Sequence, residues 1–185
     1  MKPKDDHPNP WKTLSTHTQY DNPWILVEEH HVINPAGNPG IYGTVSFKNR
    51  AIGILPLFDN GDTLIVGQYR YPLKQYSWEI PMGGAPAGED NLQCAQRELK
   101  EETGYQATQW QMILHNHLSN SITQEEGFVY VAKGLQPGEM ALEETEDISV
   151  KRLPFETVFQ MAMTGEITDG LSVNGILKAR LLGLA

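Results

Sequence analysis

The stretch that decides the fold is GGAPAGEDNLQCAQRELKEETGY, residues 83–105, a glycine-rich turn followed by a helical pattern. Asp90 is a favourable N-terminal cap, and Gly104 is a favourable C-terminal stop. Apolar residues recur at helical spacing and predict one face turned toward the core; they are Leu92, Ala95 and Leu99. The stretch therefore predicts a helix over about residues 90–103.

A second face of this helix gathers carboxylates. At about 100° per residue, Glu98, Glu101 and Glu102 fall within an arc of about 100°. Like charges at this spacing destabilise an isolated helix by about a few tenths of a kcal/mol per pair, and the helix dipole disfavours anions in the last turn. A divalent cation would compensate, and Mg²⁺ prefers carboxylate oxygen. The alternative is that RELKEE is a solvated, charged helix face.

Composition limits the classes of protein to consider. The chain has 185 residues, 39% of them hydrophobic, and a formal net charge of −9. It is long enough for one ordinary core, and its negative charge argues against a nucleic-acid partner bound through a basic surface. The longest apolar run, at 51–58, is shorter than a membrane span, and the first ten residues lack a signal core. With Cys94 as the single cysteine, we expect a soluble, cytoplasmic protein without a membrane partner.

Strand and helix patterns alternate along the rest of the chain. Strands are expected at 24–33, 41–48, 50–58, 63–71, 107–118, 126–133 and 147–152, and further helices at 154–164 and 172–183. Asn60-Gly61 is a strong hairpin signal between two of these strands. The pattern predicts an α/β (α+β) sandwich in which helices flank a mixed β-sheet, with an N-terminal extension of antiparallel strands.

The spacing of residues around the acidic helix matches a known pattern. Gly83, Glu89, Arg97-Glu98-Leu99, Glu101-Glu102 and Gly104 follow G-x5-E-x7-R-E-U-x-E-E-x-G-U, where U is usually aliphatic, and only Tyr105 departs from it. This segment resembles the Nudix box. The resemblance implies a loop-helix-loop that holds metal ions and hydrolyses a nucleoside diphosphate linked to another moiety.

Segments outside the box resemble one branch of that family. GQYRYPLKQYSWEIPMGG at 67–84, EETEDISV at 143–150 and EITDGLS at 166–172 are similar to the ADP-ribose and nucleoside-diphosphate-sugar pyrophosphatases. The region HLSNSITQEEG lacks a proline that many ADP-ribose enzymes carry beyond the box. The resemblance therefore implies a range of nucleoside diphosphate sugars that includes ADP-ribose.

The resemblance also implies roles for particular residues. The metal ligands for Mg²⁺, with Mn²⁺ as a substitute, would be the Met82 carbonyl, Glu89, Glu98, Glu101 and Glu102. Arg70 would contact the substrate diphosphate, and Glu79 would lie near the substrate. Arg97 is interpreted as an internal counter-ion of the glutamates.

A general base is expected in the later acidic loop. By resemblance it is Glu144, with Glu143 and Glu146 as weaker candidates, so that Glu144, Glu98 and Glu102 form the catalytic set. The alternative is that LEETED is an exposed acidic turn.

Four other residues have open interpretations. Trp24 could stack on a nucleobase or pack in a core or dimer. His115 and His117 share one face of a strand but lack a third metal ligand at suitable spacing, which favours a surface or packing role. Cys94 has no histidine at catalytic spacing, so a thiol nucleophile is not expected.

The chain divides by resemblance into an N-terminal strand extension, 1–48, and a Nudix hydrolase domain, 49–185. The extension is expected to pack against or exchange with a partner in a homodimer. Two other functions stay open: a nucleoside-triphosphate or RNA 5′-end pyrophosphohydrolase, and a nucleotide-sensing module without catalysis.

Overall fold

The computed structural model describes residues 7–142 and 147–185 and contains two compact units. The first unit comprises the residues up to Lys48 together with Ser119–Gln124, and the second comprises Asn49–Leu118 and Glu125–Ala185. The short segment 119–124 was not part of the N-terminal extension expected from the sequence.

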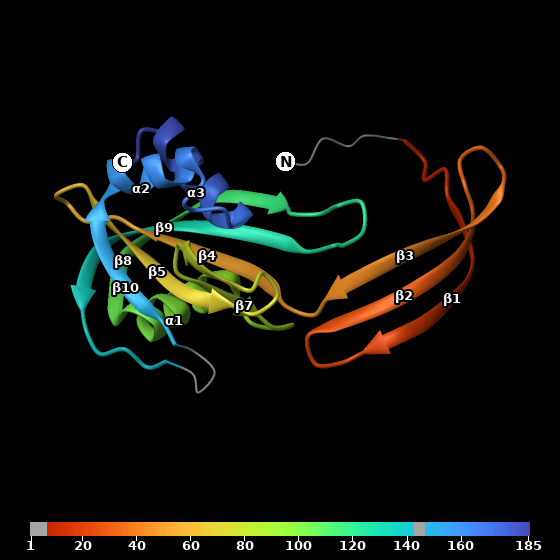
Figure 1. Cartoon of the computed structure of the whole chain (residues 1–185), viewed down its shortest axis with the longest axis horizontal. Coiled ribbons are helices and arrows are strands. Elements are labelled where there is room, and N and C mark those ends of the chain that lie inside the picture. Colours follow the sequence, from red (N-terminus) through yellow and green to blue (C-terminus); the bar gives the residue numbers. More distant parts are fainter. Residues whose placement is uncertain (1–6, 143–146) are drawn as a thin grey trace. The chain divides into compact units, whose positions relative to one another are not determined.

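The first unit is a three-stranded antiparallel sheet (Figure 1). It contains β1 (Lys12–Asp21), β2 (Ile25–Ile33) and β3 (Pro39–Phe47), in the order β1-β2-β3. The segment 119–124 lies along β3, where the amide of Val45 donates to the carbonyl oxygen of Ile122 at 2.9 Å. Strand β1 was not predicted, because every one of its residues is exposed and its sequence is largely polar.

The second unit contains two sheets. The four-stranded sheet has the order β7-β4-β9-β8, from β7 (Met82–Ala85), β4 (Arg50–Pro56), β9 (Glu126–Pro137) and β8 (Tyr105–His117). It is mixed, because β4 and β9 are parallel whereas the other pairs are antiparallel. The three-stranded sheet has the order β10-β5-β6, from β10 (Ser149–Pro154), β5 (Asp62–Arg70) and β6 (Gln75–Glu79).

Helices cover both faces of the four-stranded sheet (Figure 1). Helix α1 (Asn91–Thr103) packs on one face, on a core that includes Ile52 and Ile54. Helices α2 (Phe155–Thr164) and α3 (Gly170–Leu181) belong to the other core, which also takes side chains from the three-stranded sheet. The predicted mixed sheet flanked by helices is thus confirmed. In the described ranges, every helix is too short or too polar to cross a bilayer.

The turn at Asn60-Gly61 forms, with Gly61 at φ 84°, but it does not close an ordinary hairpin. Its flanking strands β4 and β5 belong to different sheets and share only the isolated bridge between Leu57 and Thr63. Both edges of β4 are already paired, with β7 and β9. The hairpin prediction was therefore wrong in its pairing, because a turn signal does not determine which sheet receives the next strand.

Candidate active site

Helix α1 begins and ends where the sequence predicts. Asp90 accepts hydrogen bonds from the amides of Leu92 and Gln93 at 2.9 and 3.2 Å, and Gly104 adopts the left-handed conformation at φ 74°. Leu99 is fully buried, which contributes about 1.5–3 kcal/mol and outweighs the repulsion of a few tenths of a kcal/mol per carboxylate pair. Ala95 is also fully buried, whereas Leu92 is only half-buried. Core packing can therefore hold an acidic helix in place.

Arg97 lies among three carboxylates and bonds to all of them. Its Nε and Nη2 donate to the two Glu89 oxygens, both at 3.1 Å. Its Nη1 donates to Glu98 at 2.6 Å and to Glu101 at 2.9 Å. The hydrogen bonds from Arg97 are the main cause that lowers the pKa of Glu89, and Glu89 in turn raises the pKa of Arg97. These are the contacts expected of an internal counter-ion, and they keep the guanidinium and Glu89 charged.

Strand β7 supplies the wall against which the buried carboxylates rest. A Cβ at Gly83 would lie 2.0 Å from the carboxyl carbon of Glu98, so glycine is required for this carboxylate to occupy its position. The amide of Met82 donates to Glu102 Oε2 at 2.9 Å. Glu98 and Glu102 are 6% and 1% exposed, so both are buried. Part of the carboxylate face that the sequence predicts is thus enclosed between helix and strand.

The donor set of this site fits divalent metal ions. Four carboxylates, those of Glu89, Glu98, Glu101 and Glu102, outnumber the one guanidinium that bonds to three of them. Like charges held close together repel one another, and more strongly where they are buried, so further positive charge would stabilise the group. Carboxylate oxygens are the hard ligands that Mg²⁺ and Mn²⁺ prefer.

A second arginine lies at a cavity of about 190 Å³ between β5, β6 and the start of α3. Arg70 Nε donates to Glu79 Oε1 at 2.9 Å, and its Nη2 contacts the other oxygen of the same carboxylate. Glu79 is 3% exposed, whereas the Arg70 side chain is 35% exposed. The Glu79 bond is the largest cause of a raised Arg70 pKa, and the charges of Asp169 and Glu102 add to it. The Arg70 guanidinium is therefore held in a fixed orientation at this cavity, beside the carboxylates of Glu79 and Asp169.

Sequence reasoning did not single out Asp169, which also lines this cavity. Asp169 caps α3 by accepting from the amide and hydroxyl of Ser172 at 2.7 and 2.8 Å. The Ser172 hydroxyl accepts from the amide of Ile80 at 3.0 Å, which ties α3 to the end of β6. The signal available was the capping pattern in EITDGLS, an aspartate three residues before a serine.

Glu125 is a further carboxylate that sequence reasoning missed. It is half-buried just before β9, and its pKa is raised, first by desolvation and then by the charge of Asp169. A half-buried carboxyl group with a raised pKa is a candidate proton acceptor.

Some predicted site residues belong to the first unit or lie outside the described residues. Trp24 belongs to the first unit, in the turn between β1 and β2, and is 68% exposed. Glu143, Glu144 and Glu146 lie outside the described residues. Cys94 is fully buried, and desolvation, followed by the charge of Glu98, raises the pKa of its thiol to about 12. This thiol stays protonated at neutral pH, as expected for a group without a nucleophilic role.

Comparisons with known proteins give the family. A NUDIX domain model matches residues 47–169, and a model of the nucleoside diphosphate sugar hydrolase N-terminal domain matches residues 11–45. The chain belongs to the Nudix family. It is an enzyme of the pyrophosphohydrolase class, and Nudix hydrolases depend on divalent metal ions.

Individual relatives cover nearly all of the chain. The ADP-ribose pyrophosphatase of Mycobacterium tuberculosis is 29% identical over 170 residues, covering 90% of this chain and 82% of the relative. The methanol dehydrogenase activator of Bacillus methanolicus is 34% identical over 164 residues, covering 88% of each. A crystal structure of an ADP compounds hydrolase matches with a TM-score of 0.84 at 21% identity, over 95% of this chain and 96% of that chain, which supports the fold.

Proposed function

We propose that this enzyme hydrolyses the diphosphate bond of ADP-ribose and related nucleoside diphosphate sugars, with Mg²⁺ as the physiological cation and Mn²⁺ as a substitute. The products are a nucleoside monophosphate and a sugar phosphate. The names of the similar proteins from Mycobacterium tuberculosis and Bacillus subtilis, both ADP-ribose pyrophosphatases, support this substrate class.

One structural observation carries the proposal: an arginine held by a buried carboxylate lines a polar cavity. The Arg70 guanidinium is held by two hydrogen bonds to Glu79, so its remaining donors are oriented before substrate binds. Such a fork suits the oxygens of a diphosphate. In this proposal, Arg70 binds the substrate diphosphate while the carboxylates of the acidic helix hold the cations.

The buried position of Glu79 changes its proposed role. Because both of its oxygens bond to Arg70 and it is 3% exposed, Glu79 positions that arginine for the substrate. Truncating Glu79 should therefore weaken substrate binding through Arg70, not through a lost contact of its own.

The acidic helix supplies the electrostatic part of the reaction. Glu98 and Glu102 would hold the cations, with Glu101, Glu89 and the Met82 carbonyl as further ligands. When bound, divalent cations neutralise charge on the diphosphate and lower the pKa of a bound water. The contacts of Arg97 keep Glu89, Glu98 and Glu101 oriented. The site's own carboxylates are thus committed to cations, and the attacking water needs a separate base.

Glu144 is the proposed base by resemblance, and Glu125 is a second candidate because desolvation raises its pKa. The two candidates are separated by measuring kcat against pH for Glu144→Gln and Glu125→Gln. The true base gives a large loss of kcat and removes the acidic limb of the pH profile. If neither variant lowers kcat, the base lies elsewhere.

The substrate class is tested by incubating the enzyme with Mg²⁺ and a panel of ADP-ribose, GDP-mannose, UDP-sugars, dinucleotides and triphosphates, followed by product identification. We expect turnover of ADP-ribose and of other nucleotide sugars. Turnover of triphosphates alone would favour the alternative pyrophosphohydrolase, and no turnover of any diphosphate-linked compound would refute the proposal.

The first unit is proposed as a homodimerisation element. It exposes large apolar side chains, namely Trp11, Leu14, Tyr20, Trp24 and Ile41. Exposed apolar surface of this kind favours burial against a partner. Sedimentation should give a dimer, and a monomer would contradict this part of the proposal. The cytoplasmic location expected from the single cysteine likewise stays a prediction.

A further inference from the structure

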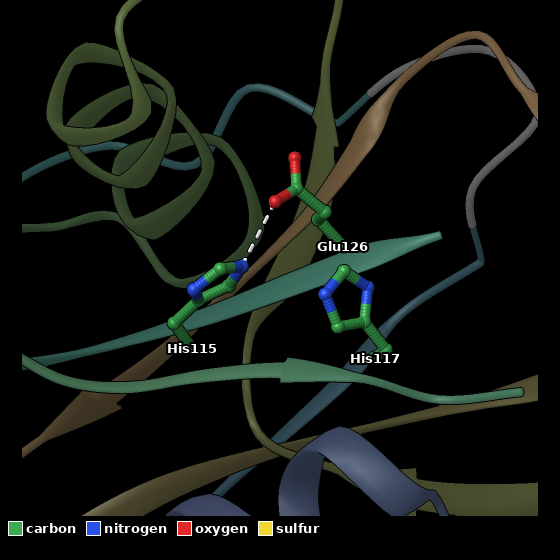
Figure 2. A group of neighbouring side chains, drawn as sticks. All are labelled: His115, His117 and Glu126. Carbon is green, nitrogen blue, oxygen red and sulfur yellow. Dashed lines mark hydrogen bonds and ion pairs between the residues drawn. The ribbon is translucent and has the colours of Figure 1, made fainter. Parts of the chain in front are cut away.

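Two histidines and a glutamate gather on the sheet outside the acidic helix (Figure 2). His115 and His117 come from β8, and Glu126 comes from the facing position of β9, where His117 and Glu126 are cross-strand partners. One ligand atom from each side chain lies within 4.8 Å of those of the other two. Among the residues that the structure describes, no other trio of histidine, cysteine or acidic side chains meets this condition.

The antiparallel register explains why these side chains meet. Residues two apart on a strand point to the same face, and cross-strand partners share that face. Phe128, the cross-strand partner of His115, packs on the core beneath α1, so the group lies on the α1 face of the four-stranded sheet. The sequence spacing of His115 and His117 lacked a third ligand, and strand pairing supplies it.

The His115 ring is already held in place. It stacks on Phe128 with ring centroids 4.5 Å apart and planes at 0°, and its Nε2 lies 2.9 Å from Glu126 Oε1. Ligand bonds of about 2.0–2.1 Å in a tetrahedral zinc site put neighbouring ligand atoms about 3.3 Å apart. The observed separations, from 2.9 Å to less than 4.8 Å, bracket that value. Small side-chain rotations are sufficient to bring the three ligands onto one ion.

We propose that His115, His117 and Glu126 bind a transition-metal ion of the Zn²⁺ class at a site separate from the acidic helix. Two imidazoles and one carboxylate form a ligand set typical of zinc with an open fourth position. Imidazole favours Zn²⁺, Ni²⁺ and Cu²⁺, whereas the all-oxygen site of α1 favours Mg²⁺ and Mn²⁺. Both histidines are exposed, so an ion can reach them from solvent. This ion would link β8 to β9 at the start of β9.

The test uses the tag-free full chain, stripped with a chelator and titrated with ZnCl₂ by calorimetry in excess Mg²⁺. To separate the two sites, the same titration is made on the variant Glu98→Gln/Glu102→Gln, which lacks two buried carboxylates of the acidic helix. We expect one Zn²⁺ per chain in both proteins. This readout does not require catalysis, so it stands even if the proposed hydrolysis fails.

Ligand variants decide the location. His117→Gln and Glu126→Gln in the Glu98→Gln/Glu102→Gln background should each weaken Zn²⁺ binding by at least about tenfold, whereas His7→Gln should not. Co²⁺ bound in place of Zn²⁺ should show an absorption spectrum that changes in His117→Gln. Circular dichroism checks that each variant is folded, and Glu126→Gln preserves side-chain shape if His117→Gln does not fold. Binding that is unaffected by both variants, or no Zn²⁺ binding in the double variant, would overturn the proposal and leave His115 and Glu126 as a surface ion pair.

Discussion

The acidic site of α1 and the histidine site of β8 and β9 lie on the same face of the four-stranded sheet, but the chain builds them differently. The four carboxylates proposed as ligands at the first site lie within residues 89–102, most of them on one helix, and Arg97 bonds to three of them. The ligands of the second come from two strands, and their meeting depends on the register between His117 and Glu126.

The difference is one of locality. In a helix, residues that are three or four positions apart in the sequence are neighbours on one face. The acidic site is therefore specified by a short stretch of sequence. A strand places only alternate residues on one face, so a third ligand must come from a neighbouring strand. The two sites also differ in the ions that we expect them to bind. Carboxylates prefer hard cations such as Mg²⁺ and Mn²⁺, whereas imidazoles suit borderline cations such as Zn²⁺.

The largest effect should come from Glu102→Gln, which removes a buried carboxylate of the acidic site. We expect kcat/KM for ADP-ribose to fall roughly 100- to 1,000-fold, because charge stabilisation in the transition state is lost. Glu156→Gln, an exposed carboxylate on α2, is the matched control. Retained activity in Glu102→Gln would show that the metal ions bind away from this helix.

A smaller loss, about 10- to 100-fold, is expected for Arg97→Lys. Lysine keeps the charge, but it lacks the planar fork that bonds to Glu89, Glu98 and Glu101 together. Steady-state kinetics at several Mg²⁺ concentrations would show a raised requirement for the cation. Unchanged kinetics would mean that the carboxylates orient themselves without the guanidinium, as the histidine site must.

Gly83→Ala tests the close approach of β7 to the Glu98 carboxylate. We expect kcat to fall about tenfold. The new Cβ would lie 2.0 Å from the Glu98 carboxyl carbon, and a flexible side-chain end can move away without unfolding the chain. The thermal midpoint should therefore change little. Gly84→Ala is the control, because its Cβ would meet Asn49 at 2.8 Å instead. Equal losses in the two variants would indicate a general disturbance of β7.

The smallest effect concerns stability and pH. Arg97 lowers the pKa of Glu89 in the folded state. The pair therefore stabilises the fold fully at pH values above the unfolded-state pKa of Glu89, and this contribution is lost as the pH falls through the folded-state pKa. Glu89→Gln should thus lower the free energy of unfolding by about 1 kcal/mol or less at neutral pH, since the pair is partly solvated. Urea unfolding of the metal-free chain should show this difference vanishing in acid. A constant difference across pH would exclude the ion pair as its cause.

Much of the second unit was predictable because its signals are local. Helix α1 was expected at about 90–103 and forms at Asn91–Thr103, with its cap at Asp90 and its stop at Gly104. Of β6, only the end was recognised, in the strand-like WEIP at 78–81, and β7 was missed, because both strands are short and carry glycine or polar residues without a clear alternation. Their existence depends on pairing with β5 and β4.

The sequence by itself determined the acidic helix, its apolar face and the spacing of its carboxylates, because helical geometry relates residues only three or four positions apart. Only the tertiary structure decided that Gly83 makes room for Glu98 and that Arg70 is held by Glu79 beside a cavity also lined by Asp169. It also decided that Glu126 joins two histidines of another strand. These contacts follow from strand register and packing, which no local pattern specifies.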